Sequence, residues 1–253
     1  MQVSLWGVSK TYTDGPRPTP ALRPITLEIQ SGEFVSLIGP SGCGKSTLLK
    51  IIADQTSPSN GEVRLDGAPP ALARGQKRIA WMAQNPALLP WKTVIDNVRL
   101  PQLINRQARH NAPKPESLLS MVGLDDTAQA YPSTLSGGMQ QRVALARTLA
   151  TGAPLWLMDE PFAALDELTR EQLTEEVLTL WATFHPTVLW VTHNIIEAIR
   201  MADRVFVLSP GPGAIRATLS IHTPRSRDET SPEMVRILRE LRQILREPWN
   251  DRA

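Results

Sequence analysis

The feature that most constrains this chain is a glycine-rich run, Gly39-Pro40-Ser41-Gly42-Cys43-Gly44-Lys45-Ser46, between an apolar segment and a helix-like one. The preceding residues, Phe34 to Ile38, read as a buried strand, and Thr47 to Lys50 begin a helix. Small residues let backbone N–H groups wrap around an anion, and the N-terminus of the helix attracts negative charge. The order strand, loop, helix therefore predicts a phosphate-binding loop in an α/β domain.

The side chains of this loop fit a nucleoside triphosphate with a metal ion. Lys45 would neutralise the β- and γ-phosphates, Ser46 would offer its hydroxyl to Mg²⁺, and Thr47 would reach the α-phosphate. The predicted nucleotide contacts are Gly39, Pro40, Ser41, Gly42, Cys43, Gly44, Lys45, Ser46 and Thr47. A glycine-rich turn without a ligand is the alternative, and the flanking strand and helix argue against it.

Two adjacent carboxylates follow another apolar run, Leu155 to Met158. We expect Asp159 to hold the Mg²⁺ and Glu160 to polarise the attacking water as general base. Such a pair also occurs as a loop start or a helix cap, but the phosphate loop upstream favours the catalytic interpretation. His193 follows the apolar run Thr187 to Val191, and the phosphate loop and the two acids favour a place in the same site. A structural histidine is the alternative there.

A second anion-binding helix start is predicted at Leu135 to Arg142, where the serine cap Ser136 and the glycines Gly137 and Gly138 open a helix. One nucleotide cannot obviously use two such helix ends of the same chain. A head-to-tail homodimer accounts for both, if Ser136-Gly137-Gly138 of each subunit closes over the nucleotide held by the phosphate loop of the other. An ordinary capped helix is the alternative.

The remaining pattern predicts an α/β fold with an inserted helical part. Strand-like runs at Val63 to Leu65, Ile79 to Met82 and Val205 to Leu208 add to those above, and the alternating segment Ile25 to Ile29 precedes them. The region 90–149 reads as helical, with a capped helix start at Thr93 and a helix end at Gly123. We divide the chain into a main domain, 1–230, with this helical subdomain inserted, and a C-terminal amphipathic helix and tail, 231–253. That helix has a basic face, for which solvent exposure is a simpler explanation than a membrane-surface role.

Composition narrows the partners and the compartment. The 27 Lys and Arg residues against 25 Asp and Glu leave a net charge of +2, which gives no support to a nucleic-acid partner. The single cysteine excludes an internal disulfide, and the first residues lack a signal-peptide pattern. No apolar stretch reads as a membrane span. We therefore expect a protein of the reducing cytoplasm that reaches the membrane only through a partner.

These motifs resemble those of the ATP-binding cassette (ABC) ATPases over nearly the whole chain. The resemblance implies a P-loop NTPase, RecA-like core with an antiparallel β subdomain and an inserted helical subdomain. It identifies Gly39 to Thr47 as the Walker A motif, Leu135 to Gln140 as the signature and Asp159-Glu160 as the end of Walker B. It adds Gln84 as the Q-loop residue at the metal and the attacking water, and His193 as the switch histidine. Three further nucleotide contacts follow from it: Tyr12 on the adenine, Gln140 in the signature and Asp166 in the D-loop.

The resemblance also implies the cofactors and partners. ATP and Mg²⁺ are expected, with a homodimer formed on ATP binding, transmembrane permease subunits, an indirectly coupled substrate-binding protein and no nucleic acid. The cytoplasmic face of the cell membrane is the expected location. A non-transport ABC ATPase acting on DNA or ribosomes is the rival, and such proteins carry coiled-coil inserts or two cassettes that are not seen here. A cassette without turnover is a second rival, against which the intact Gln84, Glu160 and His193 argue.

A subgroup resemblance bears on the cargo. The segments Leu88 to Val94 and Leu208 to Gly213 resemble those of nitrate, aliphatic sulfonate and taurine importers, with a pyrimidine vitamin precursor as an alternative cargo. We expect the loop from Gln84 to Asn97 to receive a permease helix through exposed apolar residues such as Trp91, for which a core position is the alternative. Two departures from the family are Asp54 in place of glycine and a short, proline-rich insert around Arg106 to Pro115.

Overall fold

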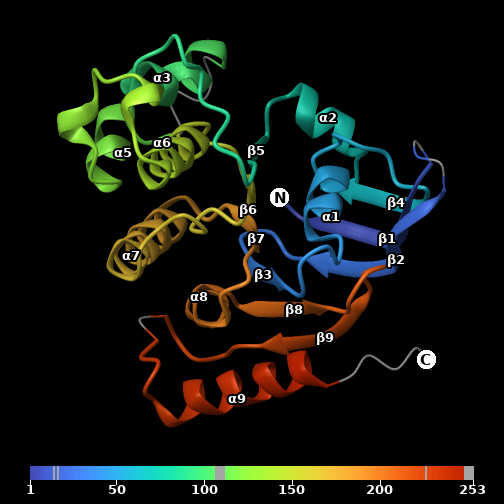
Figure 1. Ribbon diagram of the computed structural model, residues 1–253. Coiled ribbons are helices and arrows are strands. Elements are labelled where there is room, and N and C mark those ends of the chain that lie inside the picture. Colours follow the sequence, from blue (N-terminus) through green and yellow to red (C-terminus); the bar gives the residue numbers. More distant parts are fainter. Residues whose placement is uncertain (14, 16, 106–111, 226, 248–253) are drawn as a thin grey trace. The chain divides into compact units, whose positions relative to one another are not determined.

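The structure, a computed structural model, describes residues 1–13, 15, 17–105, 112–225 and 227–247. It divides into two compact units, one formed by Met1–Arg74 with Thr187–Ala253 and the other by Gly75–Pro186. Both mix helices with strands, as predicted, and each is described separately below (Figure 1).

The first unit contains an antiparallel sheet of three strands in the order β2-β1-β4. Its strands are β1 (Val3–Tyr12), β2 (Thr19–Ile29) and β4 (Asn60–Leu65). Val3 pairs with Ile29 on one side and with Leu65 on the other, and all three side chains are buried. Strand β2 begins six residues before the alternating segment that predicted it. The expected antiparallel β portion is thus present.

The same unit contains parallel strands that carry the phosphate loop. Strand β3 (Phe34–Ile38) lies between β7 (Thr187–Val191) and β8 (Arg204–Leu208) and is parallel to both. All five residues of β3 are buried, and burial of each large apolar side chain contributes about 1.5–3 kcal/mol. The sequence did not predict β9 (Ile215–Ser220), which pairs antiparallel with β8. The connection from β8 is too short for the crossover that a parallel strand requires.

Helices of the first unit follow the parallel strands. Helix α1 (Lys45–Ile52) begins after β3, and α8 (Ile195–Met201) packs against β3. Helix α2 (Pro70–Gly75) ends where the second unit begins.

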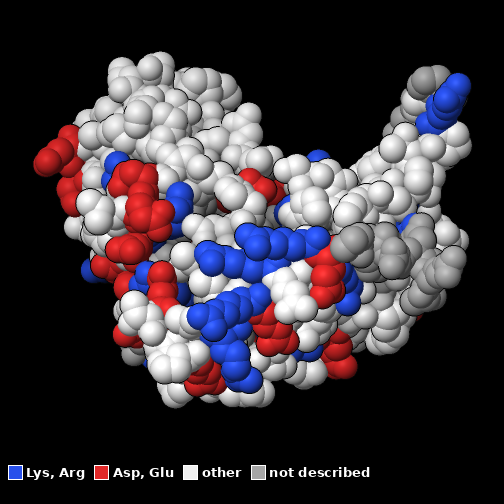
Figure 2. Space-filling view, turned by 60° about the horizontal axis from the view of Figure 1, so that its bottom comes forward, with Lys and Arg blue, Asp and Glu red and all other residues white. Residues whose placement is uncertain are grey.

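The predicted C-terminal helix is α9 (Pro232–Arg246), which Ser231 caps through a bond from the Met234 amide. It packs against α8 and lies beside β9, where Arg216 donates to the Glu247 carbonyl over 2.8 Å (Figure 1). Its outer side carries both arginines and glutamates, and charged residues of both signs gather on that side of the molecule in Figure 2. This mixture of signs is typical of a solvated face. The tail residues 248–253 lie outside the described part of the chain.

The second unit has two parallel strands, β5 (Ile79–Met82) and β6 (Leu155–Asp159), together with the helices. Its helices are α3 (Val94–Ile104), α5 (Pro115–Met121), η1 (Asp125–Thr127), η2 (Pro132–Thr134), α6 (Gly137–Leu149) and α7 (Glu167–Phe184). The described residues between 90 and 149 contain helices and no strand, as predicted. Of the proline-rich insert, residues 106–111 lie outside the described part. None of the described helices combines the length and apolarity that crossing a membrane requires.

Sequence signals explain where these helices begin. Thr93 caps α3 and Ser136 caps α6, each by accepting a hydrogen bond from the amide three residues on. Pro115 opens α5, and the chain leaves that helix at Gly123, whose φ of 63° suits glycine. The sequence predicted the helix starts at Thr93 and Ser136 and the helix end at Gly123.

Candidate functional site

The phosphate loop of the first unit has the conformation that its glycines permit. Gly42 and Gly44 have φ values of 76° and 97°, in the left-handed region. A Cβ on Gly44 would lie 2.5 Å from a methyl of Leu22 on β2, so the loop requires glycine there. Lys45 is 7% exposed, and its ammonium donates to the Gly39 and Pro40 carbonyls over 2.8 and 3.0 Å. A buried cation thus spans a loop that ends at the N-terminus of α1.

The turn between β8 and β9 supports this loop from behind. A Cβ on Gly213 would lie only 2.0 Å from the Cys43 carbonyl oxygen, and one on Gly211 would lie 3.2 Å from that of Gly42. Gly213 also bonds to β2, because its N–H donates to the Ala21 carbonyl over 3.1 Å. The sequence shows Gly211 and Gly213 in this turn but does not predict their contact with the phosphate loop. That contact depends on a close approach of two segments far apart in sequence.

Tyr12 lies at the end of β1 beside the start of α1. Its hydroxyl is 3.4 Å from Thr47 Oγ1, and the Lys10 ammonium lies 5.1 Å from the ring centroid. The ring is half-buried. The structure therefore brings Tyr12 next to the predicted α-phosphate contact, and its stacking on adenine stays a prediction.

His193 and the phosphate loop leave the same edge of the parallel strands. Leu37 pairs with Val191, so Gly39 and His193 each lie two residues beyond a paired position on neighbouring strands. The Thr192 amide donates to the Leu37 carbonyl over 3.3 Å, which keeps the two chains together past the pair. The His193 side chain is exposed at this edge. Its role at the γ-phosphate stays a prediction.

In the second unit, the predicted acids and Gln84 lie together. Asp159 ends β6 and is 4% exposed, and Glu160 follows in the left-handed region with φ 51°. A Gln84 amide N–H donates to Glu160 Oε2 over 3.3 Å. Gln141, which the sequence analysis missed, donates from α6 to the Glu160 carbonyl over 3.4 Å. A non-glycine residue held at positive φ is typical of functional sites.

The signature segment forms an exposed helix start. Ser136 and Gly137 are exposed, whereas Gly138 is half-buried and could carry no Cβ, which would lie 2.9 Å from the Ala164 carbonyl oxygen. The Gln140 amide donates to the Pro132 carbonyl over 3.0 Å and so fixes the turn before the helix. This open N-terminus of a 13-residue helix is suited to an anion.

Asp166 has a structural role in addition to its predicted nucleotide contact. Its carboxylate caps α7 by accepting from the Thr169 amide over 3.0 Å and from the Thr169 hydroxyl over 2.8 Å. These bonds lower the pKa of the Asp166 carboxyl below its ordinary value. The contact with nucleotide stays a prediction.

The loop that starts at Gln84 is exposed at its tip and fixed at its base. Trp91 is 71% exposed, so the alternative of a core position is wrong. Asn97 is fully buried and fixes the loop through a bond from the Leu89 amide of 2.8 Å and three bonds to backbone carbonyls. The sequence analysis named Asn97 in the loop but missed this role.

The described residues contain no cluster of three or more His, Cys, Asp and Glu side chains able to hold a metal by themselves. Mg²⁺ does not require one, because in nucleotide sites it is held by one or two protein ligands together with phosphates and waters. Oxygen donors are available at the predicted positions, since Ser46 is half-buried at the start of α1 and Asp159 ends β6. These donors suit a hard cation.

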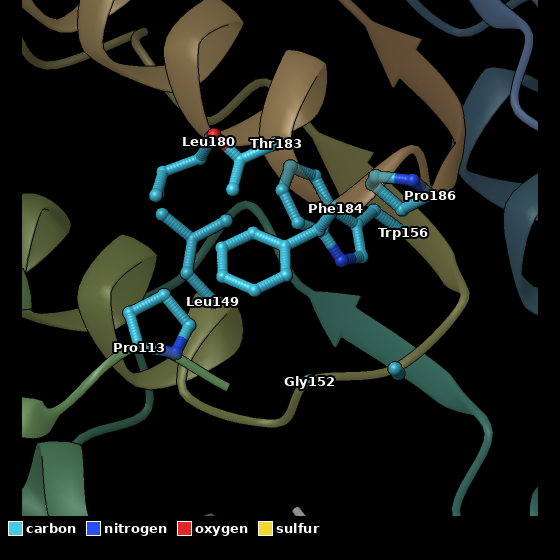
Figure 3. A pocket seen from close by; sticks show the side chains of 9 residues that line it. Pro113, Leu149, Gly152, Trp156, Leu180, Thr183, Phe184 and Pro186 are labelled. Atoms are coloured by element: carbon cyan, nitrogen blue, oxygen red, sulfur yellow. The ribbon is translucent and has the colours of Figure 1, made fainter. Parts of the chain in front are cut away.

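A cavity of about 380 Å³ in the second unit is lined by none of the predicted site residues. Mostly apolar side chains from α6, β6 and α7 surround it, among them Leu149, Trp156 and Phe184 (Figure 3). None of its lining residues carries the positive charge that a triphosphate site requires.

Comparisons with known proteins agree with these motifs. Residues 22–163 match the profile of a family described as "ABC transporter". An aliphatic sulfonates import ATP-binding protein of Bacillus cereus is 37% identical over 96% of this chain and 95% of its own length. A nitrate import ATP-binding protein of Synechococcus elongatus is 41% identical over 87% and 81%, and a taurine import ATP-binding protein of Rhizobium johnstonii is 40% identical over 90% of each. A dimeric ATP-binding cassette solved with ADP and Pi superposes with a TM-score of 0.77, at 34% identity over 88% of this chain and 100% of that one.

Proposed function

The chain belongs to the ABC transporter family, and on this premise we propose the site chemistry, the partners and the cargo of this ATP-hydrolysing importer subunit. It binds and hydrolyses ATP and forms the dimeric cassette of that family. The observation that carries the proposal is the presence of two anion-binding helix starts. One, at α1, is preceded by the phosphate loop, and the other, at α6, is exposed.

The phosphate loop would hold the triphosphate. Backbone N–H groups from Gly39 to Thr47 surround the phosphates, and Lys45 moves from the loop carbonyls to the β- and γ-phosphate oxygens. Tyr12 covers the adenine, a role that its place beside Thr47 supports. Mg²⁺ would be held by Ser46, Gln84 and Asp159, and it supplies charge neutralisation at the β- and γ-phosphates.

Glu160 would accept the proton of the attacking water. Its backbone is held in the left-handed region, and the bond from Gln84 orients its carboxylate, as a general base requires. His193 holds the γ-phosphate from the exposed edge that it shares with the phosphate loop. Asp166, the cap residue of α7, would contribute a further contact with the nucleotide.

The exposed α6 start would act on the nucleotide of a second subunit. Ser136, Gly137, Gly138 and Gln140 then complete the cage around the γ-phosphate of the partner. Closing and reopening of this ATP sandwich drives transmembrane permease subunits. The loop from Gln84 to Asn97 receives a permease helix, and exposed Trp91 contributes the apolar contact. Through this contact with the permease, the chain would lie at the cytoplasmic face of the cell membrane. A substrate-binding protein would deliver the cargo to the permease on the other side of that membrane.

The relatives favour a small oxidised-sulfur or nitrogen compound as the cargo. Proteins with printed roles in aliphatic sulfonate, nitrate and taurine import cover most of this chain at about 40% identity. We therefore propose uptake of an aliphatic sulfonate, taurine or nitrate. Growth of a deletion strain, free of redundant systems, on each compound as sole sulfur or nitrogen source tests the cargo. Normal growth on all three would contradict it.

ATP-dependent dimerisation tests the site chemistry. The Glu160→Gln protein should be largely monomeric without nucleotide and dimeric with MgATP by light scattering. Adding Ser136→Arg should abolish the shift, because a large cation then faces the site of the partner. Ser120→Arg, at another exposed serine of the same unit, is the matched control and should leave the shift intact. A protein that stays monomeric at all ATP concentrations would contradict the sandwich.

A further inference from the structure

Arg147, in the last turn of α6, reaches the loop that begins with Gln84. Its Nη1 donates to the Ala87 carbonyl over 3.0 Å, and its Nη2 donates to the Pro86 carbonyl over 2.6 Å. The guanidinium is half-buried, and burial lowers its pKa. Hydrogen bonds from a charged donor in such surroundings are stronger than those between neutral groups. The signature helix is therefore tied to this loop by a strong two-point contact.

The contact falls where the loop backbone is strained. Ala87 has φ 44°, in the left-handed region that residues with a Cβ avoid. The two carbonyls that Arg147 holds are those of Ala87 and of the residue before it. Arg147 thus fixes the peptide groups on both sides of the strained φ angle. The Ala87 amide also donates to Asn85 Oδ1, but over 3.4 Å. Without the two guanidinium bonds, only this longer bond would oppose relaxation of Ala87 toward negative φ and a changed path of the loop.

The consequence reaches the predicted general base. Gln84 lies three residues before Ala87, and its amide donates to Glu160. The far half of the loop is fixed independently, because Asn97 of α3 holds Leu89 and Lys92. Arg147 therefore controls the half of the loop that contains Gln84. Helix α6 begins with the signature serine, so the same helix connects that serine to the Gln84 segment.

We propose that Arg147 is a positioning residue that holds Gln84 in its place beside Glu160 by fixing the left-handed turn at Ala87. The proposal deepens the proposed function. Its effect on catalysis rests on the proposed function, but the role of Arg147 in fixing the loop does not. Arg147 would act through the loop backbone and would not touch ATP.

Four variants of the purified full-length chain test the proposal: Arg147→Ala, Ala87→Gly, the double variant, and Arg99→Ala as a matched control. Arg99 pairs with Glu116 and with Asp96 on the surface of the same unit, and not with the Pro86 and Ala87 carbonyls that Arg147 holds. Steady-state ATPase gives kcat and KM, and hydrogen exchange reports the amides of residues 84–89. Thermal unfolding shows whether each variant keeps its fold.

For Arg147→Ala we expect kcat to fall about 10- to 100-fold, the range for misplacement of a catalytic group by about 1 Å. KM for ATP should change less than about 2-fold, because the phosphate loop is untouched. Exchange of the 84–89 amides should accelerate. Ala87→Gly alone should behave like the unmodified protein. In the double variant it should recover about 5-fold or more of kcat, since glycine adopts positive φ without the penalty.

The rescue separates positioning from general destabilisation. If Arg147 only stabilised the helices, Ala87→Gly would not restore kcat, and that result would overturn the proposal. Unchanged exchange of the 84–89 amides in Arg147→Ala would overturn it too, as would an equal effect of Arg99→Ala. If the unmodified chain hydrolyses no ATP, the proposed function fails, but the exchange measurement still decides whether Arg147 fixes the loop.

Discussion

Gly213→Ala should displace the phosphate loop without altering any residue that contacts nucleotide. The added Cβ would lie 2.0 Å from the Cys43 carbonyl oxygen, so the two backbones must separate by about 1 Å or more. The obstacle is backbone and cannot rotate away. Overpacking of this kind costs about 1–3 kcal/mol. If ATP binding must restore the original loop, that cost corresponds to a loss of roughly 5- to 150-fold in ATP affinity.

The only cysteine of the chain gives an independent probe of the loop. Cys43 is fully buried, and burial raises the pKa of its thiol, so it should react slowly with thiol reagents near neutral pH. Gly213→Ala should accelerate labelling of Cys43 under native conditions. Nucleotide affinity by calorimetry and labelling rate should therefore change together.

Two variants control this experiment. Gly211→Ala, whose Cβ would lie 3.2 Å from the Gly42 carbonyl oxygen, should have a smaller effect of the same kind. Gly75→Ala, at a position with nothing within 4 Å, should change neither quantity. Gly213→Ala protein with unchanged affinity and unchanged Cys43 labelling would refute the idea that the β8–β9 turn supports the loop.

Three further changes have expected outcomes. Lys45→Ala should weaken ATP binding, because it removes the buried ammonium of the loop, and unchanged affinity in a binding assay would count against that role. Asp54 has φ 57°, so Asp54→Val should lower the free energy of unfolding by about 1–2 kcal/mol while Asp54→Gly should nearly preserve it. If denaturant titrations show the same loss of unfolding free energy for Asp54→Val and Asp54→Gly, the left-handed backbone is not the cause of the loss. Trp91→Ala should leave basal ATPase nearly unchanged yet reduce transport in the reconstituted importer, and normal coupled transport would exclude its permease contact.

Local patterns sufficed for much of the fold. The strand before the phosphate loop, β5 and β7 were predicted within a residue of their bounds, because each is a short apolar run between turn residues. Thr93 and Ser136 were recognised as helix starts because capping depends on neighbours in sequence. The family usually has glycine where this chain has Asp54. The structure explains that preference, because the backbone of Asp54 is left-handed with φ 57°.

Contacts between distant segments could not be predicted in this way. Gly213 approaches Cys43 across a long stretch of chain, and nothing near either residue indicates the other. Arg147 was missed because an arginine in a helix usually faces solvent, and only packing shows that it binds two loop carbonyls. Strand β9 was missed because its pattern is weak and its place depends on pairing with β8. The exposure of Trp91 was expected from the sequence, whereas the hydrogen bonds by which Asn97 fixes its loop were not.

The most direct test of the account is the rate of phosphate release from MgATP by the Glu160→Gln protein, with nucleotide binding measured on the same sample. Glu160 is held at positive φ and bonded to Gln84, which is the arrangement expected of a general base. The account predicts that ATP binding persists while turnover falls at least ~100-fold relative to the unmodified chain. Near-normal turnover by the Glu160→Gln protein would contradict it.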